Sequence, residues 1–473
     1  MGLLLLVLFP AGAAAVAYFV RSARLRLGLL VGTALLHLAS TARLWADPVG
    51  PELGGWLAVD ALGLLVLTLV SVLFLVVAVY AVGFLRTEPP RGGRVFVSGL
   101  LGFLAAATLV AVSHHLALLW VGMETTTLSL APLIYHRHDR RSLEAVWKYL
   151  LLSSVGIALA LFGTFFLAAA QTSGRPLLLE DLIAGGARLQ PALLRTAFTF
   201  LLVGYGTKMG LAPLHAWKPD TYGEAPSLVA GLMAGGLTSC AFLGVARITQ
   251  VTMAAGQAAF VQPLFLAFGM VSLVVAAAFM IGQPDLKRLL AYSSVEHMGL
   301  LVLGLGLGGV GPYGTVLHLV NNGLTKGVMF LAVGNVVLVT GAATREAARG
   351  ILRRLPVSGV LLLLGLFAVT GSPPFGLFLS EFIILKAAIA QGHLMIALTV
   401  VALLAVIFVG MGAVVLDVIY SPSEVPTRGA GESLLLVAGP AVLLLAVLVL
   451  GLYVPPPLNR VLLAAARGLG VTP

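Results

Sequence analysis

Six ionisable residues stand inside apolar stretches of the sequence and could carry protons or other ions. They are Glu124, Lys208, His297, His318, Lys326 and Glu381. A charged side chain at the centre of a bilayer costs at least about 2.5–3.5 kcal/mol, and such residues pair with one another or mark an ion pathway. The set is therefore a candidate path for ion translocation.

Glu124 and Lys208 carry opposite charges and are expected on two different membrane helices. Each would lower the cost of burying the other if the side chains face one another. A buried lysine can also exchange its proton, which makes it a carrier and not only a fixed charge. The alternative is a static ion pair that joins two helices without moving an ion.

His318 and Lys326 are eight residues apart in HLVNNGLTKGVMF. On one helix they would share a face about 12 Å apart in height, so that proton transfer between them needs water. His297, which follows Glu296, either belongs to this set or is a hydrogen-bonded core histidine. The histidines and carboxylates have no compact ligand spacing along the chain, and we therefore expect no metal site.

The composition excludes a soluble protein. The chain has 473 residues, of which 60% are hydrophobic and 10% charged, and a mean hydropathy of +1.07. Apolar windows of about 20 residues recur from end to end, as in a multi-pass membrane protein. The single cysteine, Cys240, excludes a disulfide framework, a cysteine-bound iron–sulfur cluster and a thiolate zinc site. We expect no cofactor and no catalytic redox centre in this chain.

The charge pattern indicates topology. The net charge of +10 is spread over short loops and does not point to nucleic acid. The first apolar stretch has no basic residue before it, which favours a membrane helix over a cleavable signal peptide. Basic residues gather in alternate loops near 21–26, 86–94, 137–141, 287–288, 345–354 and 428, which predicts that these loops are cytoplasmic and that both termini lie outside the cell membrane. His114 and His115 are expected at a solvated outer helix end, and Arg247 near an outer loop.

The apolar windows predict an all-α fold with about fourteen membrane helices. Their expected bounds are 2–20, 27–45, 58–85, 95–112, 115–134, 147–170, 195–212, 224–247, 262–282, 289–308, 313–340, 357–389, 394–419 and 432–453. We divide the chain into three N-terminal helices over 1–94, two five-helix repeats over 95–250 and 251–420, and a last helix with a tail over 421–473.

Two of the predicted helices contain proline interruptions. KMGLAPLHAWKPD includes Pro213, and VTGSPPFGLFLSEF includes Pro373 and Pro374. Proline removes a backbone donor and opens the helix, which a bilayer tolerates only where protein or a wet cavity surrounds the backbone. Breaks at corresponding places in two halves of a chain are typical of inverted repeats. The sequence therefore predicts one broken helix in each repeat.

Four segments in a fixed order resemble the signature motifs of a known family. KMGLAPLHAWKPDTYGEAPS, LKRLLAYSSVEHMG, HLVNNGLTKGVMFL and GSPPFGLFLSEF are similar to segments of the antiporter-like membrane subunits of respiratory complex I and its relatives. WVGMETTTLSLAPLI and SLEAVWKYLLLSSVGIALALFGT most resemble the F-type subunit of hydrogenase-4. The resemblance covers about residues 95–410.

This resemblance implies a chain of buried charges across the midplane of fourteen helices. Glu124 would be the fifth-helix glutamate, Lys208 the lysine of the first broken helix, His297 the tenth-helix histidine, Lys326 the eleventh-helix lysine and Glu381 the terminal residue of the second broken helix. Other membrane and peripheral subunits would carry iron–sulfur clusters and a nickel–iron or flavin group. Their redox chemistry would drive protons or sodium ions across the lipid bilayer.

Several positions depart from the family pattern. Ser239 stands where many relatives have a basic residue in the eighth helix, Asn322 replaces a common histidine, and Lys218 replaces a leucine. These changes put a continuous proton path in question. The residues expected to support the site are His215, Glu224, Ser239, Pro213, Pro373 and Pro374.

We weigh three functions and one degenerate case. The leading hypothesis is a proton- or sodium-translocating subunit of a hydrogenase-4-like or NADH-quinone-oxidoreductase-like complex. The alternatives are a subunit of a multi-subunit sodium/proton antiporter and the energy-coupling membrane partner of an inorganic-carbon uptake system. Ser239 and Asn322 also leave open a structural subunit that does not pump.

Overall fold

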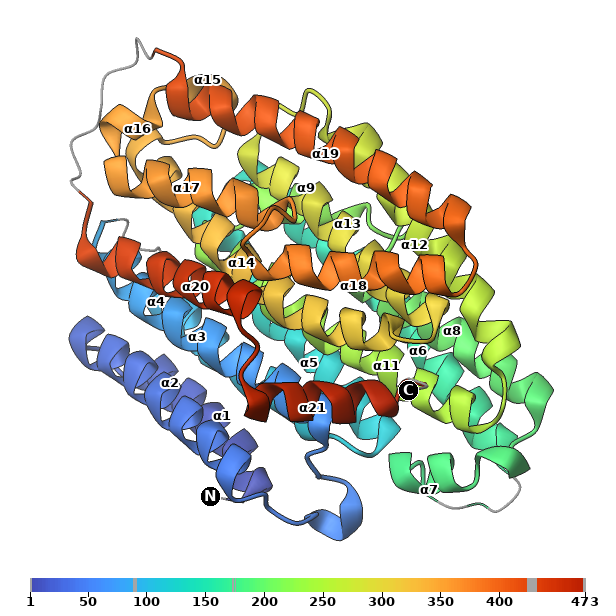
Figure 1. Ribbon diagram of the computed structural model, residues 1–473. Helices are drawn as coiled ribbons and strands as arrows, with labels where there is room; N and C mark the ends of the chain where they lie inside the picture. Colours follow the sequence, from blue (N-terminus) through green and yellow to red (C-terminus); the bar gives the residue numbers. More distant parts are fainter. Residues whose placement is uncertain (1, 88–91, 172–173, 175, 423–431, 471–473) are drawn as a thin grey trace.

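A computed structural model describes residues 2–87, 92–171, 174, 176–422 and 432–470 of the chain. These residues form helices joined by short connections, with isolated β-bridges but no extended strand (Figure 1). Arg91 and Arg428 of the predicted cytoplasmic loops lie outside the described residues. The all-α class predicted from the apolar windows is confirmed.

Eleven helical segments of the described residues are long and apolar enough to cross a membrane on their own. Counted with the shorter and broken crossings, the described helices agree with about fourteen membrane segments. These segments are α1 (Leu3–Phe19), α2 (Ala23–Ala46), α3 (Ala61–Thr87), α4 (Gly93–Val112), α5 (Leu116–Ile134), α6 (Arg140–Ala170), α8 (Pro191–Met209), α10 (Ser227–Leu232) with α11 (Thr238–Ala254), α12 (Ala258–Met280), α13 (Leu286–Leu307), α14 (Gly311–Thr340), α17 (Pro356–Val369) with α18 (Gly376–Ala390), α19 (Leu394–Tyr420) and α20 (Leu434–Leu452).

Short helices connect or cover the membrane segments. They are α7 (Leu179–Ala184), α9 (Trp217–Glu224), α15 (Arg345–Ala348), α16 (Ile351–Arg354) and α21 (Pro456–Arg467). The sequence predicts the residues of α21 only as part of a tail. In the fold, α21 runs across the bundle below α20 and packs on α3 and α14 (Figure 1). The Tyr313 hydroxyl of α14 donates a hydrogen bond to Asn459 of α21 at 2.7 Å, which fixes this cover.

Both predicted helix interruptions are present. The first broken helix, α8, ends at Met209, and Gly210 closes it in the left-handed conformation that glycine adopts without strain. Pro213 follows, and the chain resumes as α9. The second break separates α17 from α18 at Pro373 and Pro374. Each proline cannot continue the hydrogen-bond ladder, so the predicted single spans 195–212 and 357–389 end or divide there.

The segment predicted over 224–247 contains an irregularity that the sequence analysis did not foresee. Residues Met233–Leu237 form a π-helical turn between α10 and α11. Gly235 in this turn packs directly against Leu73 of α3 and the Gly323 carbonyl of α14, where a Cβ atom would not fit. The turn thus permits a close approach of three helices near the centre of the bundle.

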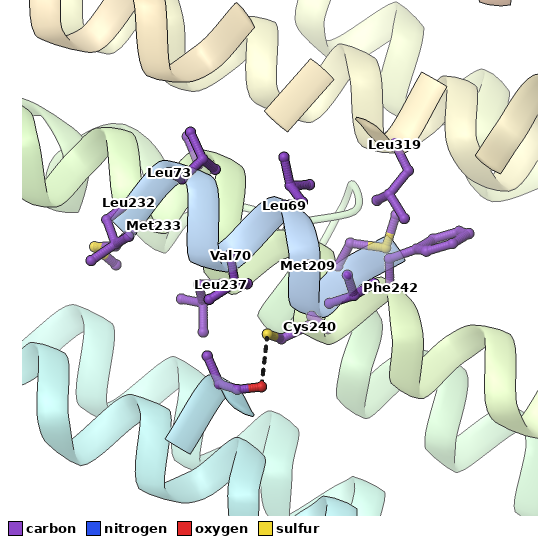
Figure 2. Close-up of a cluster of buried hydrophobic side chains, with 14 of the residues drawn as sticks. Leu69, Val70, Leu73, Met209, Leu232, Met233, Leu237, Cys240, Phe242 and Leu319 are labelled. Atoms are coloured by element: carbon purple, nitrogen blue, oxygen red, sulfur yellow. Dashed lines mark hydrogen bonds between the residues drawn. The ribbon is translucent and has the colours of Figure 1, made fainter. Parts of the chain in front are cut away.

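An apolar cluster occupies this central contact. Figure 2 shows Val70 of α3 pointing toward Leu237, while Leu69 and Leu73 point to the other side of α3. Met209 and Leu319 belong to the same cluster. The Cys240 sulfur lies 4.0 Å from the Ala107 carbonyl oxygen. Close van der Waals packing of these side chains stabilises the contact between the helices.

Candidate functional site

The first half of the site links α5 to the end of α8. The Lys208 ammonium is fully buried and donates hydrogen bonds to the Thr127 hydroxyl and, at 3.2 Å, to the Tyr149 hydroxyl. It also lies 4.8 Å from the centre of the Tyr149 ring. The Thr127 hydroxyl is 3.3 Å from a carboxylate oxygen of Glu124. Thr127 therefore stands between the predicted lysine and the predicted glutamate.

Glu124 and Lys208 do not form a direct ion pair in the part of the chain that the structure describes. The Lys208 ammonium nitrogen does not lie within 4.0 Å of a Glu124 carboxylate oxygen. Glu124 is partly exposed on the outer face of α5, whereas Lys208 is enclosed. The sequence motif WVGMETTTLSLAPL contained Thr127, but its role became visible only when α5 and α8 were placed together.

The break after α8 presents two predicted supporting residues. Pro213 is exposed and His215 is half-buried, with its ring 6.3 Å from the Tyr292 ring. The Ala212–Pro213 and Pro373–Pro374 peptide bonds are both cis. His215 is therefore near the break but does not hydrogen-bond to Lys208 among the described residues.

A hollow of about 480 Å³ lies beside α9, at the ends of α6 and α13. Glu224, another predicted supporting residue, lines it. Lys148 bridges Asp220 at 2.6 Å and Glu144 at 2.7 Å, and Arg288 lies 3.1 Å from Asp220. These charges keep the hollow polar and suit it to hold water next to α9. It lies on the side of the arginine-rich loops.

Lys218 is a buried lysine that the sequence identifies only as a departure from the family pattern. It is fully buried in the first turn of α9, and its ammonium donates a hydrogen bond to Ser294 at 3.0 Å. The signal available in the sequence was the lysine itself in HAWKPD, beside the proline break. Its burial could not be predicted, because Lys218 stands at the start of a polar segment of the sequence.

Lys326, from the second half of the chain, contacts α13 next to the Lys218 contact. The Lys326 ammonium, fully buried in α14, donates a hydrogen bond to Ser293 at 2.6 Å. Glu296, one turn further along α13, is buried and also interacts with Ser293. Ser293 and Ser294 are consecutive residues, so a single turn of α13 contacts both Lys218 and Lys326.

His297, His318 and Glu381 form a third group. The His297 Nδ1 and His318 Nε2 atoms are 3.1 Å apart, and the Glu381 carboxylate lies with them within 4.8 Å. The remaining ring nitrogens contact the Val369 carbonyl at 3.1 Å and the Ser380 hydroxyl at 2.9 Å. His297 is thus hydrogen-bonded in the core and also a neighbour of the other predicted residues.

This third group differs from the expectation about metal ligands. No compact ligand spacing was visible along the sequence, because α13, α14 and α18 each supply one residue. In the fold the three side chains are close enough to hold a metal ion. In metal sites, a histidine ligand is oriented by a hydrogen bond from its second ring nitrogen to a group such as a backbone carbonyl. The same contacts orient histidines that exchange a proton.

Glu381 lies over the second break. One carboxylate oxygen, Oε1, is buried without a hydrogen-bond partner, and the other lies against Gly371 between α17 and α18. The two prolines of this break, Pro373 and Pro374, are exposed. The break therefore leaves space for the carboxylate at the end of the chain of ionisable groups.

Ser239 makes no contact with the lysines in the described part of the structure. Its hydroxyl donates to the Gly235 carbonyl of its own helix at 2.6 Å. Its neighbours Leu237 and Cys240 point into the apolar cluster (Figure 2). Asn322 is buried, and neither polar atom of its amide has a partner among the described residues.

A separate buried ion pair corrects two expectations. Arg247 is fully buried in α11, and its guanidinium donates two hydrogen bonds of 2.6 Å to Asp60 at the start of α3. His114 is also buried, with Nε2 3.8 Å from Asp60. The expectation of a loop arginine and a solvated histidine was wrong. Both side chains lie in the interior next to the Asp60 carboxylate, which is distant from Arg247 and His114 in the sequence.

The fold and the site together define a class: a polytopic all-α membrane protein with two broken helices and buried lysine, histidine and carboxylate groups along its interior. The chain belongs to the NADH:quinone oxidoreductase/Mrp antiporter membrane family, whose model matches residues 113–407. It is 32% identical over 415 residues to a hydrogenase-4 component F homolog from Methylacidiphilum infernorum, covering 85% of this chain and 86% of the relative.

Solved structures share the fold. One chain of an archaeal membrane-bound sulfane sulfur reductase superposes with a TM-score of 0.89 at 23% identity, covering 99% of this chain and 98% of that one. A chain of respiratory complex I from Thermus thermophilus gives a TM-score of 0.80 at 26% identity, covering 95% and 97%. The resemblance found from the four motifs is thereby confirmed.

Proposed function

We propose that this chain is the proton- or sodium-translocating membrane subunit of a hydrogenase-4-like or NADH-quinone-oxidoreductase-like complex. One observation carries the proposal. In each half, ionisable side chains contact hydroxyl or imidazole groups that can pass a proton. Thr127 contacts both Glu124 and Lys208 in the first half. In the second half Lys326 contacts Ser293, and Glu381 lies with two histidines. The family membership supports the same function.

The geometry suggests how charge changes could move an ion. Glu124 is partly exposed, so it can respond to a charge in a neighbouring subunit, while Thr127 connects it to Lys208. A weaker negative field at Glu124 stabilises the Lys208 ammonium less and favours release of its proton. In the second half, His297 and His318 are in contact and lead to Glu381.

The assembly would consist of other membrane and peripheral subunits in the cell membrane. We expect the redox cofactors, iron–sulfur clusters with a nickel–iron or flavin group, on those subunits. The arginine-rich loops would face the cytoplasm, with both termini outside. The breaks at Pro213 and at Pro373–Pro374 support two inverted repeats over 95–250 and 251–420.

A test of this function uses the assembled complex, purified with its partner subunits and placed in vesicles. The vesicles are energised with the electron donor that the redox subunits accept, and proton uptake is followed with the trapped dye pyranine. We expect Lys208→Ala to lower uptake per electron by about tenfold or more, since it removes a positioned proton carrier. Lys386→Ala, at an exposed site on α18, is the matched control.

Two results would contradict the proposal. Undiminished uptake by an assembled Lys208→Ala complex would remove the lysine from the path. Absence of both proton uptake and ²²Na⁺ uptake in the wild-type complex would remove the function itself.

A second function has support from the family, which includes Mrp antiporter subunits. In that case the chain would exchange sodium for protons without redox partners. Purification in mild detergent distinguishes the two: redox subunits in the complex support the first function, and their absence together with sodium/proton exchange supports the second.

A further inference from the structure

Lys218 lies between the two halves of the path, although neither half was expected to include it. The departure at Ser239 removes a basic residue from α11 and leaves Lys208 without an evident route to Lys326. We propose that Lys218 is the proton relay that joins Lys208 to Lys326, in place of a basic residue at position 239. This inference rests on the proposed function of the chain.

Lys218 reaches the end of the first broken helix. Its side chain folds over Gly210, which is two residues beyond Lys208. A Cβ atom at Gly210 would overlap the Lys218 Cε atom and would stand 2.8 Å from its Nζ atom. Glycine at this position therefore serves two purposes: it closes α8 with a positive φ of 80° and leaves room for the lysine.

Lys218 also reaches the helix that serves Lys326. Its ammonium donates to the Ser294 hydroxyl at 3.0 Å, and the Lys326 ammonium donates to the Ser293 hydroxyl at 2.6 Å. A hydroxyl both accepts and donates hydrogen bonds, so it can receive one proton as it releases another. The two adjacent hydroxyls thus bring the amino groups of the two halves to one turn of α13.

The charges around Lys218 favour transfer of its proton over a fixed ammonium charge. In the described part of the chain no carboxylate lies within 4.0 Å of its ammonium. Lys326 is near enough to interact with it electrostatically. Two ammonium groups at this separation in an apolar interior repel one another, so a proton that arrives on Lys218 favours release of the proton on Lys326. Static pairing would instead require an opposite charge.

Each step conserves the proton. The Lys218 ammonium loses one proton and becomes a neutral amine, and a neutral Lys326 amine gains one proton and becomes an ammonium. Ser294 contacts the donor of this proton and Ser293 contacts its acceptor. Lys218 is recharged from Lys208. The route through α11 is less suitable, because the Ser239 hydroxyl is bonded to its own helix and Leu237 and Cys240 face the apolar cluster.

The decisive experiment separates a fixed charge from an exchangeable one. In the purified complex, Lys218→Arg keeps a positive charge and hydrogen-bond donors but does not release a proton at physiological pH. Lys218→Met keeps a long side chain but has no exchangeable proton. Lys218→His offers an exchangeable proton with an ordinary pKa of about 6.5. Lys386→Met is the control, and assembly is checked by co-purification.

We expect Lys218→Arg and Lys218→Met to lower proton uptake per electron by about tenfold or more, with the control unchanged. Lys218→His should recover part of the uptake, with an optimum at lower pH, because imidazole is a weaker base than an amine. If Lys218 had only a structural role, proton uptake in Lys218→His would not exceed proton uptake in Lys218→Met.

Wild-type uptake in either Lys218→Arg or Lys218→Met would overturn the inference. Because the larger arginine side chain can interfere with assembly, Lys218→Met alone is sufficient for this test. Loss of uptake in Lys208→Ala with full uptake in Lys218→Met would overturn the relay and leave the proposed function intact. Absence of uptake in the wild type would overturn the proposed function instead.

Discussion

The Lys208 ammonium donates a hydrogen bond to Thr127, whose hydroxyl lies 3.3 Å from Glu124. We predict that Thr127→Val separates the lysine from the glutamate, because valine keeps the shape but has no hydroxyl. Loss of a buried hydrogen bond to a charged group costs about 1–3 kcal/mol. The expected result is a lower melting temperature of the complex and reduced proton uptake per electron, measured by thermal unfolding and by pyranine fluorescence.

Thr127→Ser is the matched control, since it retains the hydroxyl and should keep most of the uptake. Equal uptake in Thr127→Val and Thr127→Ser would show that the bridge is not used. A lower melting temperature with full uptake would assign the threonine to stability alone.

Gly210 and Gly341 permit a paired test of the space around Lys218. Both close a helix with nearly the same positive φ, 80° and 79°, but only Gly210 has a side chain against it. Alanine at either position incurs a backbone strain of about 1–2 kcal/mol, because the left-handed conformation brings its Cβ atom close to a carbonyl oxygen. Gly210→Ala should additionally displace Lys218, and we expect it to reduce both melting temperature and proton uptake more than Gly341→Ala does. Equal effects on both measurements would mean that Lys218 does not depend on this contact.

Gly371 and Gly392 form a similar pair near Glu381. Gly371 has a φ of 62° and the Glu381 carboxylate directly against it, whereas Gly392 has a φ of 79° and open space. We predict that Gly371→Ala moves the carboxylate and lowers proton uptake per electron, while Gly392→Ala changes only the melting temperature. If both variants retain full uptake, the position of Glu381 over the break does not matter for transport.

Much of the fold could be predicted from the sequence, because apolar windows and prolines act locally. The break at Pro213 and the one at Pro373–Pro374 follow from the chemistry of proline alone. The π-helical turn at Met233–Leu237 could not be predicted, since it depends on the close packing of Gly235 against α3 and α14. The cover formed by α21 likewise depends on contacts distant in sequence.

The candidate site was predicted in its members but not in its connections. Glu124 and Lys208 were recognisable as buried charges, yet their link through Thr127 required the relative placement of α5 and α8. Lys218 was visible as an unusual residue, but a single sequence does not show that Ser293 and Ser294 gather two lysines at one turn. Helix periodicity places residues on a face; it does not show which face a distant helix meets.

The Asp60–Arg247 pair predicts a dependence of stability on pH. Burial opposes ionisation of Asp60, but the Arg247 guanidinium outweighs it and holds the carboxyl pKa well below its ordinary value of 3.8. A depressed folded-state pKa contributes stability that is present above the ordinary pKa and is lost as the pH falls below it. Between pH 8 and pH 5 this pair should therefore contribute a constant amount.

Asp60→Asn removes the ionised partner of a fully buried arginine. Breaking a buried ion pair costs about 3–5 kcal/mol, and we expect less here because the Asp60 side chain is 30% exposed. The variant should melt at a lower temperature than the wild type at pH 7 and pH 5, and the difference should narrow at pH 3, where only the wild type loses the contribution of this group. Thermal unfolding of both complexes at the three pH values measures this. A difference that stays the same at pH 3 would show that the Asp60 carboxylate is not the titrating group.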